Sequence, residues 1–329
     1  MGSDGSIFVV ELAGRRVTRV QPDGAKESFA TIEGSPNGSA FGADGSLYIC
    51  NNGGRWAAET STGGQWGPGG YPASIQRILP DGTIETVVTD IDGVPLNSPN
   101  DICFGPDGGF WFTDPVWPDE HGVCAPGDLG YARPSGEALR FHTELEMPNG
   151  LGVTDDGSTL LVTASRTFTI HAFAILGPGH LGKPCLFATL DDGVFPDGIC
   201  FDVTGRVLCA GHGGSLIYVF SPAGELEDKI DMDDKDISNL CFGGPDNRTL
   251  YVTESDMGAD CGDRMAHHRD DTLPGAPSGR SLEHRVRRIV PVSSGSARAI
   301  VGHICRGRAD CLDVTYVDPM IDRPSAFST

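Results

Sequence analysis

Apolar and polar positions alternate along most of the chain, in short runs separated by Gly, Asn and Asp, which is typical of β-strands joined by tight turns. The stretch "SPNDICFGPDGGFWFTDP", residues 98–115, shows the pattern most clearly, with two apolar runs on either side of an Asp-Gly turn. Gly and Asn supply the positive φ that tight hairpin turns require. We therefore predict a β-hairpin that begins at the amide of Asn100 and ends at the carboxylate of Asp114.

Four other stretches repeat this pattern: "SPNGSAFGADGSLYIC", "MPNGLGVTDDGSTLLVT", "FPDGICFDVTGRVLCA" and "ISNLCFGGPDNRTLYVT". Each copy has Asn or Asp at one register position and a turn residue eight positions later. The register residues are Asn37, Asn100, Asn149, Asp197 and Asn239, and the turn residues are Gly45, Gly108, Gly157, Gly205 and Asn247. Hairpins repeated at such intervals indicate the four-stranded blades of a β-propeller.

A sixth copy opens the chain without its first strand, since residues 4–12 match residues 44–52 and the register position would precede Met1. We predict one all-β domain over residues 1–256, a six-bladed β-propeller whose first blade lacks its inner strand. Residues 257–329 are rich in Arg and His, contain no Lys and show almost no strand pattern. One interpretation is a native irregular tail that nominally completes blade six and contributes little to the hydrophobic core. The alternative is that a reading-frame slip has replaced the native end.

The composition narrows the possible partners. A formal net charge of −21 repels nucleic acid and anionic membranes and favours cations or neutral small molecules. No apolar run approaches the ~20 residues of a membrane span, and no signal peptide is visible, so we expect a soluble, cytoplasmic protein. Among the ten cysteines, half lie in apolar strands and none forms a CxxC pair, which indicates small core residues rather than disulfides or a thiolate metal site.

The register residues are the first candidates for chemistry. Inner strands of a propeller run side by side around the axis, so Asn37, Asn100, Asn149, Asp197 and Asn239 are expected to converge at one mouth of the channel. Amide and carboxylate oxygens suit Ca²⁺ and, less well, Mg²⁺ or Mn²⁺. The alternative is that Asn and Asp before Gly only start turns. Three adjacent blades with donors at one register favour a cation site at Asn100, Asn149 and Asp197.

The second strand of each hairpin returns toward the same face. The last residue of each second strand is expected to border the mouth of the channel, or alternatively only to cap the strand end. These residues are Glu11, Asn51, Asp114, Ala164, Gly211 and Glu254. Long Gly-rich loops follow Cys50 and Asp114, and such loops often form a substrate rim. Their aromatic and imidazole groups could wall a pocket or simply pack the loops: Trp56, Trp66, Trp117 and His121.

The motifs "SPNDICFGPDGGFWFTDP", "MPNGLGV" and "FPDGICFDVTGRVLCA" resemble those of the gluconolactonase and senescence-marker protein (regucalcin) family, which is related to diisopropyl fluorophosphatase. The resemblance covers residues 1–256. It implies a six-bladed propeller, a divalent cation (Ca²⁺ or Zn²⁺) in the channel mouth and hydrolysis of lactones. It further implies that Asn149 and Asp197 are metal ligands, that Asn100 touches metal or substrate, and that Asp114 is the Asp of the family's "FTDP" stretch.

One departure from this family concerns a glutamate ligand in an "EGP" motif, whose register falls before Met1. Glu11 and Glu33 are the nearest substitutes, and neither lies in register. Loss of one anionic ligand would lower the affinity for a cation.

These observations favour a metal-dependent hydrolase that opens a sugar-type or related lactone, with Asp197 or Asp114 as the proton acceptor. Substrate contacts are expected from Asn37, Asn51, Trp56, Trp117 and His121. No GxSxG motif accompanies a His, which argues against an acyl-enzyme. Two alternatives remain: a phosphotriesterase or aryl esterase using the same site, and a non-enzymatic binding platform with a structural ion.

Overall fold

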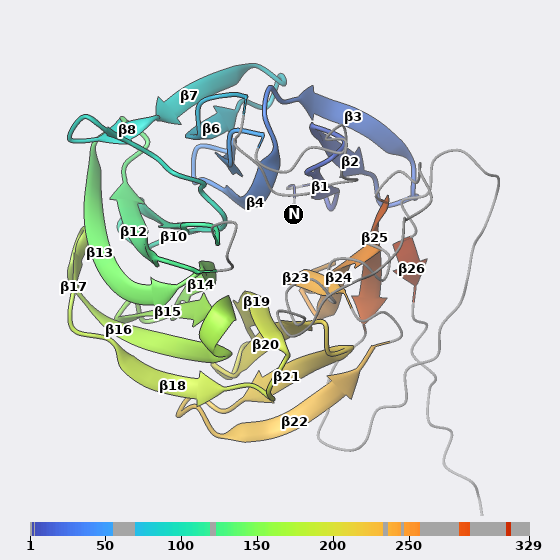
Figure 1. Cartoon of the computed structure of the whole chain (residues 1–329). Helices are drawn as coiled ribbons and strands as arrows, with labels where there is room; N and C mark the ends of the chain where they lie inside the picture. The colour runs from blue at the N-terminus through green and yellow to red at the C-terminus, as the bar shows by residue number, and fades with distance from the viewer. Residues whose placement is uncertain are drawn as a thin grey trace, which may run out of the picture.

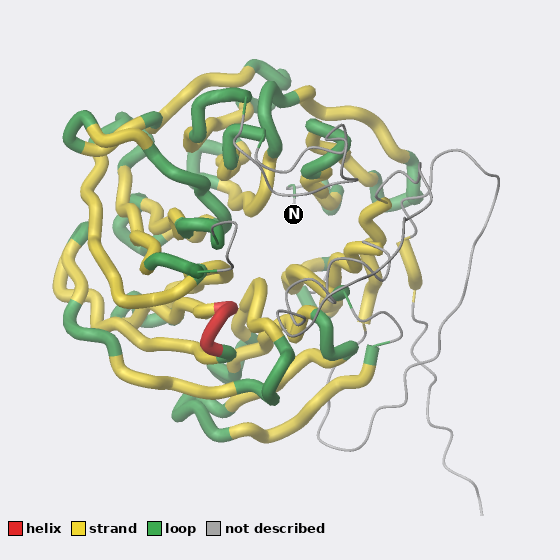
Figure 2. Tube along the Cα trace, in the orientation of Figure 1, coloured by secondary structure: helices red, strands yellow, loops and turns green. Residues whose placement is uncertain are grey.

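The computed structural model of the chain describes residues 2, 4–54, 70–118, 123–232, 236–244, 247–256, 283–289 and 314–316. Strands dominate these residues, and Figure 2 shows the single short helix, the 3₁₀ helix η1 (Ser165–Thr167), in red. Figure 1 shows the sheets arranged like blades around a central axis. The predicted all-β propeller is therefore confirmed. Within the described residues, no helix has the length and apolar character that a membrane crossing requires.

The first three sheets follow one another along the chain. The first comprises β1 (Ile7–Glu11), β2 (Arg16–Val20) and β3 (Lys26–Thr31). The second comprises β4 (Pro36–Phe41), β5 (Leu47–Asn51), β6 (Ser74–Ile78) and β7 (Ile84–Val88). A small hairpin of β8 (Asp90–Ile91) and β9 (Val94–Pro95) precedes the third. The third comprises β10 (Ile102–Phe104), β11 (Phe110–Asp114), β12 (Pro126–Ala132) and β13 (Ala138–Glu146).

The other three sheets complete the circle. The fourth comprises β14 (Pro148–Val153), β15 (Thr159–Ala164), β16 (Thr169–Gly177), β17 (His180–Leu181) and β18 (Cys185–Thr189). The fifth comprises β19 (Phe195–Phe201), β20 (Val207–His212), β21 (Leu216–Phe220) and β22 (Leu226–Asp231). The sixth comprises β23 (Ile237–Gly243), β24 (Thr249–Asp256), β25 (Glu283–Ile289) and β26 (Val314–Tyr316).

The first and last sheets differ from the others. Sheet one has three described strands in the order β1-β2-β3, and β1 corresponds to the second strand of the other blades, as the sequence predicts. In sheet six, β25 pairs antiparallel with β24, and β26 pairs parallel with β25. Both strands come from the segment expected to be irregular; the remainder of residues 257–329 lies outside the described residues.

The turns explain why the apolar runs form hairpins. Gly45, Gly108, Gly157 and Gly205 have φ between 70° and 81°, and Asn247 has φ of 56°, so all five predicted turn residues adopt the left-handed region. In the turn of the second sheet, the Asp44 carboxylate accepts a hydrogen bond from the Ser46 amide at 3.0 Å. The Asp-Gly pairs therefore fix the register in which each inner strand meets its neighbour.

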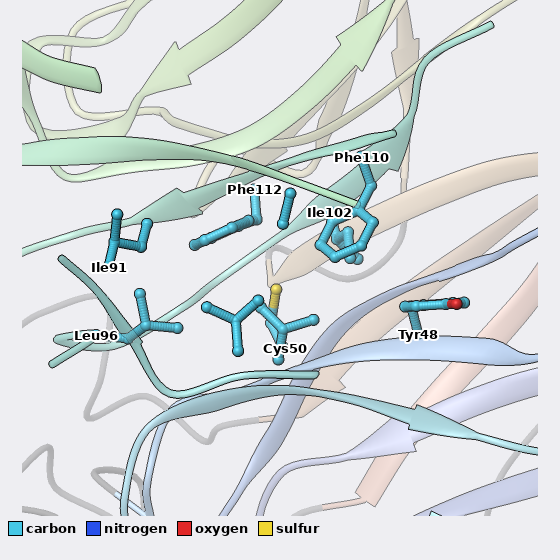
Figure 3. Close-up of a cluster of buried hydrophobic side chains, with 10 residues drawn as sticks. Tyr48, Cys50, Ile91, Leu96, Ile102, Phe110 and Phe112 are labelled. Atoms are coloured by element: carbon cyan, nitrogen blue, oxygen red, sulfur yellow. The ribbon is translucent and has the colours of Figure 1, made fainter. Parts of the chain in front are cut away.

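The core lies between adjacent sheets. In Figure 3, Tyr48 and Cys50 of β5 pack against Ile102 of β10 and against Phe110 and Phe112 of β11. Equivalent clusters join sheets three to four, four to five, and five to six. Burial of these side chains holds each blade against the next and thereby positions the inner strands around the channel.

Candidate metal and active site

A cavity of about 600 Å³ runs along the propeller axis. The five register residues of the repeats all line it: Asn37, Asn100, Asn149, Asp197 and Asn239. The propeller thus brings together residues that lie far apart in the sequence. The three predicted metal ligands share one cavity, as the register argument requires.

Bulges in the inner strands orient these residues. The pairing register shifts between Pro148 and Leu151 in β14, which spans Asn149, and between Pro196 and Ile199 in β19, which spans Asp197. The inner strands β4 and β23 shift at the same level. A bulge leaves a residue out of the ladder and redirects its side chain, and bulges are common beside active sites. The Pro and Gly residues that flank Asn149 and Asp197 lie in these bulges, so they help to set the direction of the two side chains.

Two glycines permit the close approach of neighbouring inner strands. A Cβ atom on Gly150 would lie 2.2 Å from the carbonyl oxygen of Asp197, and one on Gly198 would lie 2.2 Å from Oδ1 of Asn239. Only glycine fits at such distances. The "PNG" and "PDG" motifs therefore let the register residues of sheets four, five and six meet at the channel.

Hydroxyl groups fix the backbone and the amide of this cluster. Thr113 donates to the Asn149 carbonyl at 2.8 Å, and Thr163 donates to the Asp197 carbonyl at 3.1 Å, so each second strand holds the next blade's inner strand. The Asn149 amide nitrogen donates to Oγ of Ser165 at 3.2 Å and also to the Asp197 carboxylate. Because the amide nitrogen of Asn149 donates to Ser165, its Oδ1 is the atom that suits a ligand in the cavity.

Two carboxylates give the cavity an electronegative character: Asp101, which is buried, and Asp197, which is half-buried. Burial raises the pKa of Asp197 well above its ordinary value of 3.8, the nearby charge of Asp101 raises it further, and hydrogen bonds from Asn149 and the Gly198 amide oppose the shift. Burial likewise raises the pKa of Asp101 to about 6, against hydrogen bonds from the Ile102 and Leu151 amides and the Asn239 side chain. A cation among these groups would offset the cost of burying carboxylate charge.

The six residues predicted at the ends of the second strands do not line this cavity. The Asp114 carboxylate, 2% exposed, accepts from the Asn97 amide at 3.0 Å and the Ser98 amide at 2.6 Å, with Arg140 3.7 Å away. Burial raises its pKa to about 6, and these amides and Arg140 oppose the shift. The geometry favours the alternative of a capped strand end, because Asp114 positions the loop that leads to Asn100.

Asn51 and Glu11, like Asp114, form hydrogen bonds with nearby protein groups outside the cavity. Oδ1 of Asn51 accepts from the Ser35 amide at 3.1 Å and the Gly53 amide at 3.0 Å. The Glu11 carboxylate accepts from Nε of Arg16 at 2.9 Å and from the hydroxyl of Thr18. Neither lines the cavity, so Glu11 is not placed as a substitute ligand, and Asn51 is placed as a loop cap.

Trp117 is the one described residue among the predicted aromatic and imidazole wall groups. It lines the cavity, and its indole nitrogen donates to Oγ of Ser98 at 2.7 Å. Trp56, Trp66 and His121 lie outside the described residues. Asn37, a predicted substrate contact, also lines the cavity.

The polar cavity residues that sequence reasoning missed include Asp101, Ser165 and His212. Asp101 carried a usable signal, because three of the other copies have Gly at its position, and a carboxylate there must enter the crowded channel. His212 ends β20 opposite Phe195 and is 7% exposed. His212 directly follows Gly211, the residue predicted at the end of this strand, so the prediction for sheet five missed it by one position.

Comparisons with known proteins place the chain in a family. The family model described as "SMP-30/Gluconolactonase/LRE-like region" matches residues 1–256. A gluconolactonase from Zymomonas mobilis is 28% identical over 239 residues, 68% of this chain and 62% of that protein, so the match spans less than two thirds of this relative. Regucalcin from Xenopus laevis is 23% identical over 262 residues, 78% of this chain and 81% of that protein.

Solved structures show the same fold. A gluconolactonase from Xanthomonas campestris superposes with a TM-score of 0.63 at 28% identity, covering 77% of this chain and 80% of that chain. A calcium-binding protein, regucalcin, from Agrobacterium tumefaciens superposes with a TM-score of 0.64 at 16% identity, covering 80% and 83%. At that identity the second likeness concerns the fold alone.

Proposed function

We propose, since the chain belongs to the SMP-30/gluconolactonase/LRE-like family, that it is a metal-dependent hydrolase that opens a lactone at the ring of register residues. The observation that carries the proposal is the cluster of oxygen donors that line one cavity, with Asn100, Asn149 and Asp197 at one register and the buried Asp101 among them. The names of the gluconolactonases and of the drp35 lactonase of Staphylococcus aureus support the reaction class.

Asn100 and Asn149 would each hold a divalent cation through the amide oxygen, and Asp197 would hold it through the carboxylate. Their oxygen-only chemistry fits Ca²⁺ best, with Zn²⁺, Mg²⁺ and Mn²⁺ as alternatives. When bound, such a cation supplies Lewis acidity, which polarises an ester carbonyl and lowers the pKa of water. Asp101 adds a second negative charge without needing to be a ligand.

The chain's own residues then position the substrate and move the proton. Trp117 walls the cavity, which helps to exclude water from the lactone. Water adds to the carbonyl carbon, the ring C–O bond breaks, and a hydroxy acid is formed. Asp197 accepts the proton from water and returns it to the ring oxygen that leaves, so the protons balance over one turnover. Asp114 holds the Asn97–Ser98 loop throughout.

The test is hydrolysis of a panel of lactones, phosphotriesters and aryl esters by chelator-treated protein, followed by addition of one cation at a time. We expect lactone turnover to disappear with the chelator and to return most fully with Ca²⁺. Turnover that is indifferent to the chelator would contradict a metal-dependent reaction. Metal-dependent turnover of phosphotriesters or aryl esters without lactones would favour the esterase alternative, and no turnover at all would favour a binding platform.

A further inference from the structure

The last strand of sheet three carries an arginine that is largely buried. Arg140 lies on β13, yet only 13% of its side chain is exposed, whereas the side chain of His142, two residues further along the strand, is 83% exposed. Long charged side chains ordinarily keep the charged end in water. The guanidinium of Arg140 is instead held by protein groups.

Two carboxylates and two carbonyl groups surround this guanidinium. Its Nη1 lies 2.9 Å from Oδ2 of Asp128 and 3.7 Å from Oδ2 of Asp114, and these two residues face each other in strands β12 and β11. Its Nη2 donates to the carbonyl oxygens of Val94 at 3.0 Å and Pro95 at 3.3 Å, in β9. One side chain thus joins three strands of sheet three to the chain segment that leads into the candidate site.

Residues 94–98 are held at both ends by this arrangement. Nη2 of Arg140 binds the carbonyl oxygens at the first end, and the Asp114 carboxylate accepts the Asn97 and Ser98 amides at the second. The charge of Arg140 also lowers the pKa of Asp114, against the effect of burial, and so favours the ionised carboxylate. A shift of residues 94–98 would therefore break charge-assisted hydrogen bonds.

Two groups of the candidate site depend on where this segment lies. Asn100, a predicted cation ligand, follows Ser98 by two residues. The indole nitrogen of Trp117 donates to Oγ of Ser98 at 2.7 Å. Asn100 and Trp117 line the cavity, whereas Arg140 does not, so Arg140 can act on the cavity only through residues 94–98.

Stability alone does not explain this arrangement. Nε of Arg140 is buried and has no hydrogen-bond partner within the described residues, and a buried donor without a partner destabilises the fold. An apolar side chain on β13 would cover the sheet without this cost, and buried ion pairs are often no more stabilising than apolar replacements. The rigid fork of a guanidinium, in contrast, can bind carboxylates and carbonyls at fixed positions.

We propose that Arg140 is a positioning residue for the reaction: it holds residues 94–98 so that Asn100 reaches the cation and Trp117 walls the cavity. This inference rests on the proposed function, because Asn100 is taken to bind the cation. Lysine would not replace Arg140 fully, since an ammonium lacks donors arranged in a planar fork.

The test compares Arg140→Met with Arg133→Met in the full-length protein. Arg133 belongs to the same sheet and lies 3.7 Å from Asp107 in the turn between β10 and β11, at the end of the sheet away from residues 94–98, so it is the matched control. We expect Arg140→Met to lower the Ca²⁺ affinity, measured by calorimetry, by about tenfold, as groups that orient metal ligands commonly do. Arg133→Met should leave the affinity unchanged. Thermal melting checks that both variants are folded.

Two further measurements do not depend on catalysis. Hydrogen exchange of the Asn97 and Ser98 amides should become faster in Arg140→Met and stay unchanged in the control. In protein labelled with fluorinated tryptophan, the fluorine resonance of Trp117 should shift in Arg140→Met, whereas that of Trp111, which is buried in β11, should not. Replacement of each tryptophan by Phe assigns its resonance.

A conservative variant sharpens the test. Arg140→Lys keeps the positive charge and loses the fork, so its Ca²⁺ affinity should lie between those of wild type and Arg140→Met. If Arg140→Met does not fold, Arg140→Lys decides in its place. Lower affinity together with faster exchange of the Ser98 amide supports the inference, and wild-type values overturn it.

The remaining outcomes separate the two proposals. A folded Arg140→Met whose Ca²⁺ affinity or Trp117 resonance is unchanged overturns the inference, and so does an equal loss of affinity in the control. If wild type binds no Ca²⁺ or hydrolyses no lactone, the proposed function fails, and the exchange and fluorine measurements alone decide the inference. Faster exchange with a shifted Trp117 resonance then supports the positioning of residues 94–98 by Arg140, and wild-type values overturn it.

Discussion

The two sides of the channel are built differently. On the side of sheets three to five, bulged inner strands touch at glycines, and hydroxyls of Thr113 and Thr163 hold the backbone of the neighbouring blade. On the side where sheet one meets sheet six, the apolar cluster of the described residues has Val9 and Val20 buried, with Ile7 and Tyr251 partly buried against them. The tight contacts thus gather charge and ligand oxygens on the first side, whereas the described residues of the second side form a smaller and looser apolar cluster.

The largest effect is expected from removing the charge on the tight side. Asp197→Asn keeps the shape and an oxygen donor but removes the anionic ligand and the proton acceptor, so kcat/KM should fall by about 100-fold or more while the fold survives. Asn239→Ala, in sheet six, should lower kcat/KM much less. Lactone hydrolysis at saturating Ca²⁺ and thermal melting make the comparison. Near-normal turnover of Asp197→Asn, with loss in Asn239→Ala, would place the reaction centre on the other side.

A pH effect is expected from Asp114, which builds the loop of the tight side. Its folded-state pKa of about 6 lies above the ordinary 3.8, so between these values the folded protein retains a proton that the unfolded chain has released. The contribution to stability is complete below pH 3.8 and is lost as the pH rises through 6, by up to about 3 kcal/mol.

Denaturant unfolding of wild type and Asp114→Asn from pH 4 to pH 7 measures this contribution. Asp101 and Asp197 are present in both proteins, so their titration largely cancels in the difference. We expect the free energy of unfolding of wild type, relative to the variant, to decrease as the pH rises. An increase would mean that Arg140 and the two amides stabilise the ionised carboxylate more than burial destabilises it.

A smaller effect is expected from separating the inner strands. Gly150→Ala places a methyl group against the Asp197 carbonyl, which should destabilise the fold by about 1 to 3 kcal/mol and weaken cation binding. Gly177→Ala is the control, since nothing lies within 4 Å of a Cβ atom there. Urea unfolding and Ca²⁺ titration of both variants test the contact. Equal results for the two would show that the close approach has no role in the site.

The smallest effect is expected at Ser165, which orients the Asn149 amide. Ser165→Ala removes the acceptor for Nδ2 of Asn149 and a donor to the Pro196 carbonyl, so Ca²⁺ affinity should fall by about 2- to 12-fold, the value of one hydrogen bond. Thr167→Ala, two residues further in η1, is the matched control. Calcium affinity that is unchanged in Ser165→Ala would mean that Asp197 alone orients Asn149.

The sequence predicted the propeller, its hairpins and its register because these depend on local chemistry. Asp-Gly and Asn turns need positive φ at one position, and the φ values of Gly45 and Asn247 meet that need. The Asn and Asp at the register reach one cavity because the same bulge recurs in successive blades. A repeated local rule therefore suffices to bring distant residues together.

Other features of the site depend on contacts that no local pattern encodes. Asp114 turns to the Asn97 and Ser98 amides because the loop before Asn100 folds over its strand end, and its sequence position alone does not distinguish a cap from a base. Asp101 enters the channel because the inner strands crowd together there. The strands β25 and β26 lack the alternating pattern, so their pairing in sheet six depends on partners already in place.

The central claim is that the tight side of the channel holds a divalent cation. The most direct measurement is the anomalous difference density of a crystal soaked in Mn²⁺ or Tb³⁺, with Ca²⁺ competition as the control. The account predicts one main peak, displaced by Ca²⁺, within about 2.3 to 2.6 Å of oxygens of Asn100, Asn149 and Asp197. A main peak bound elsewhere, or none under conditions in which calorimetry detects binding, would contradict it.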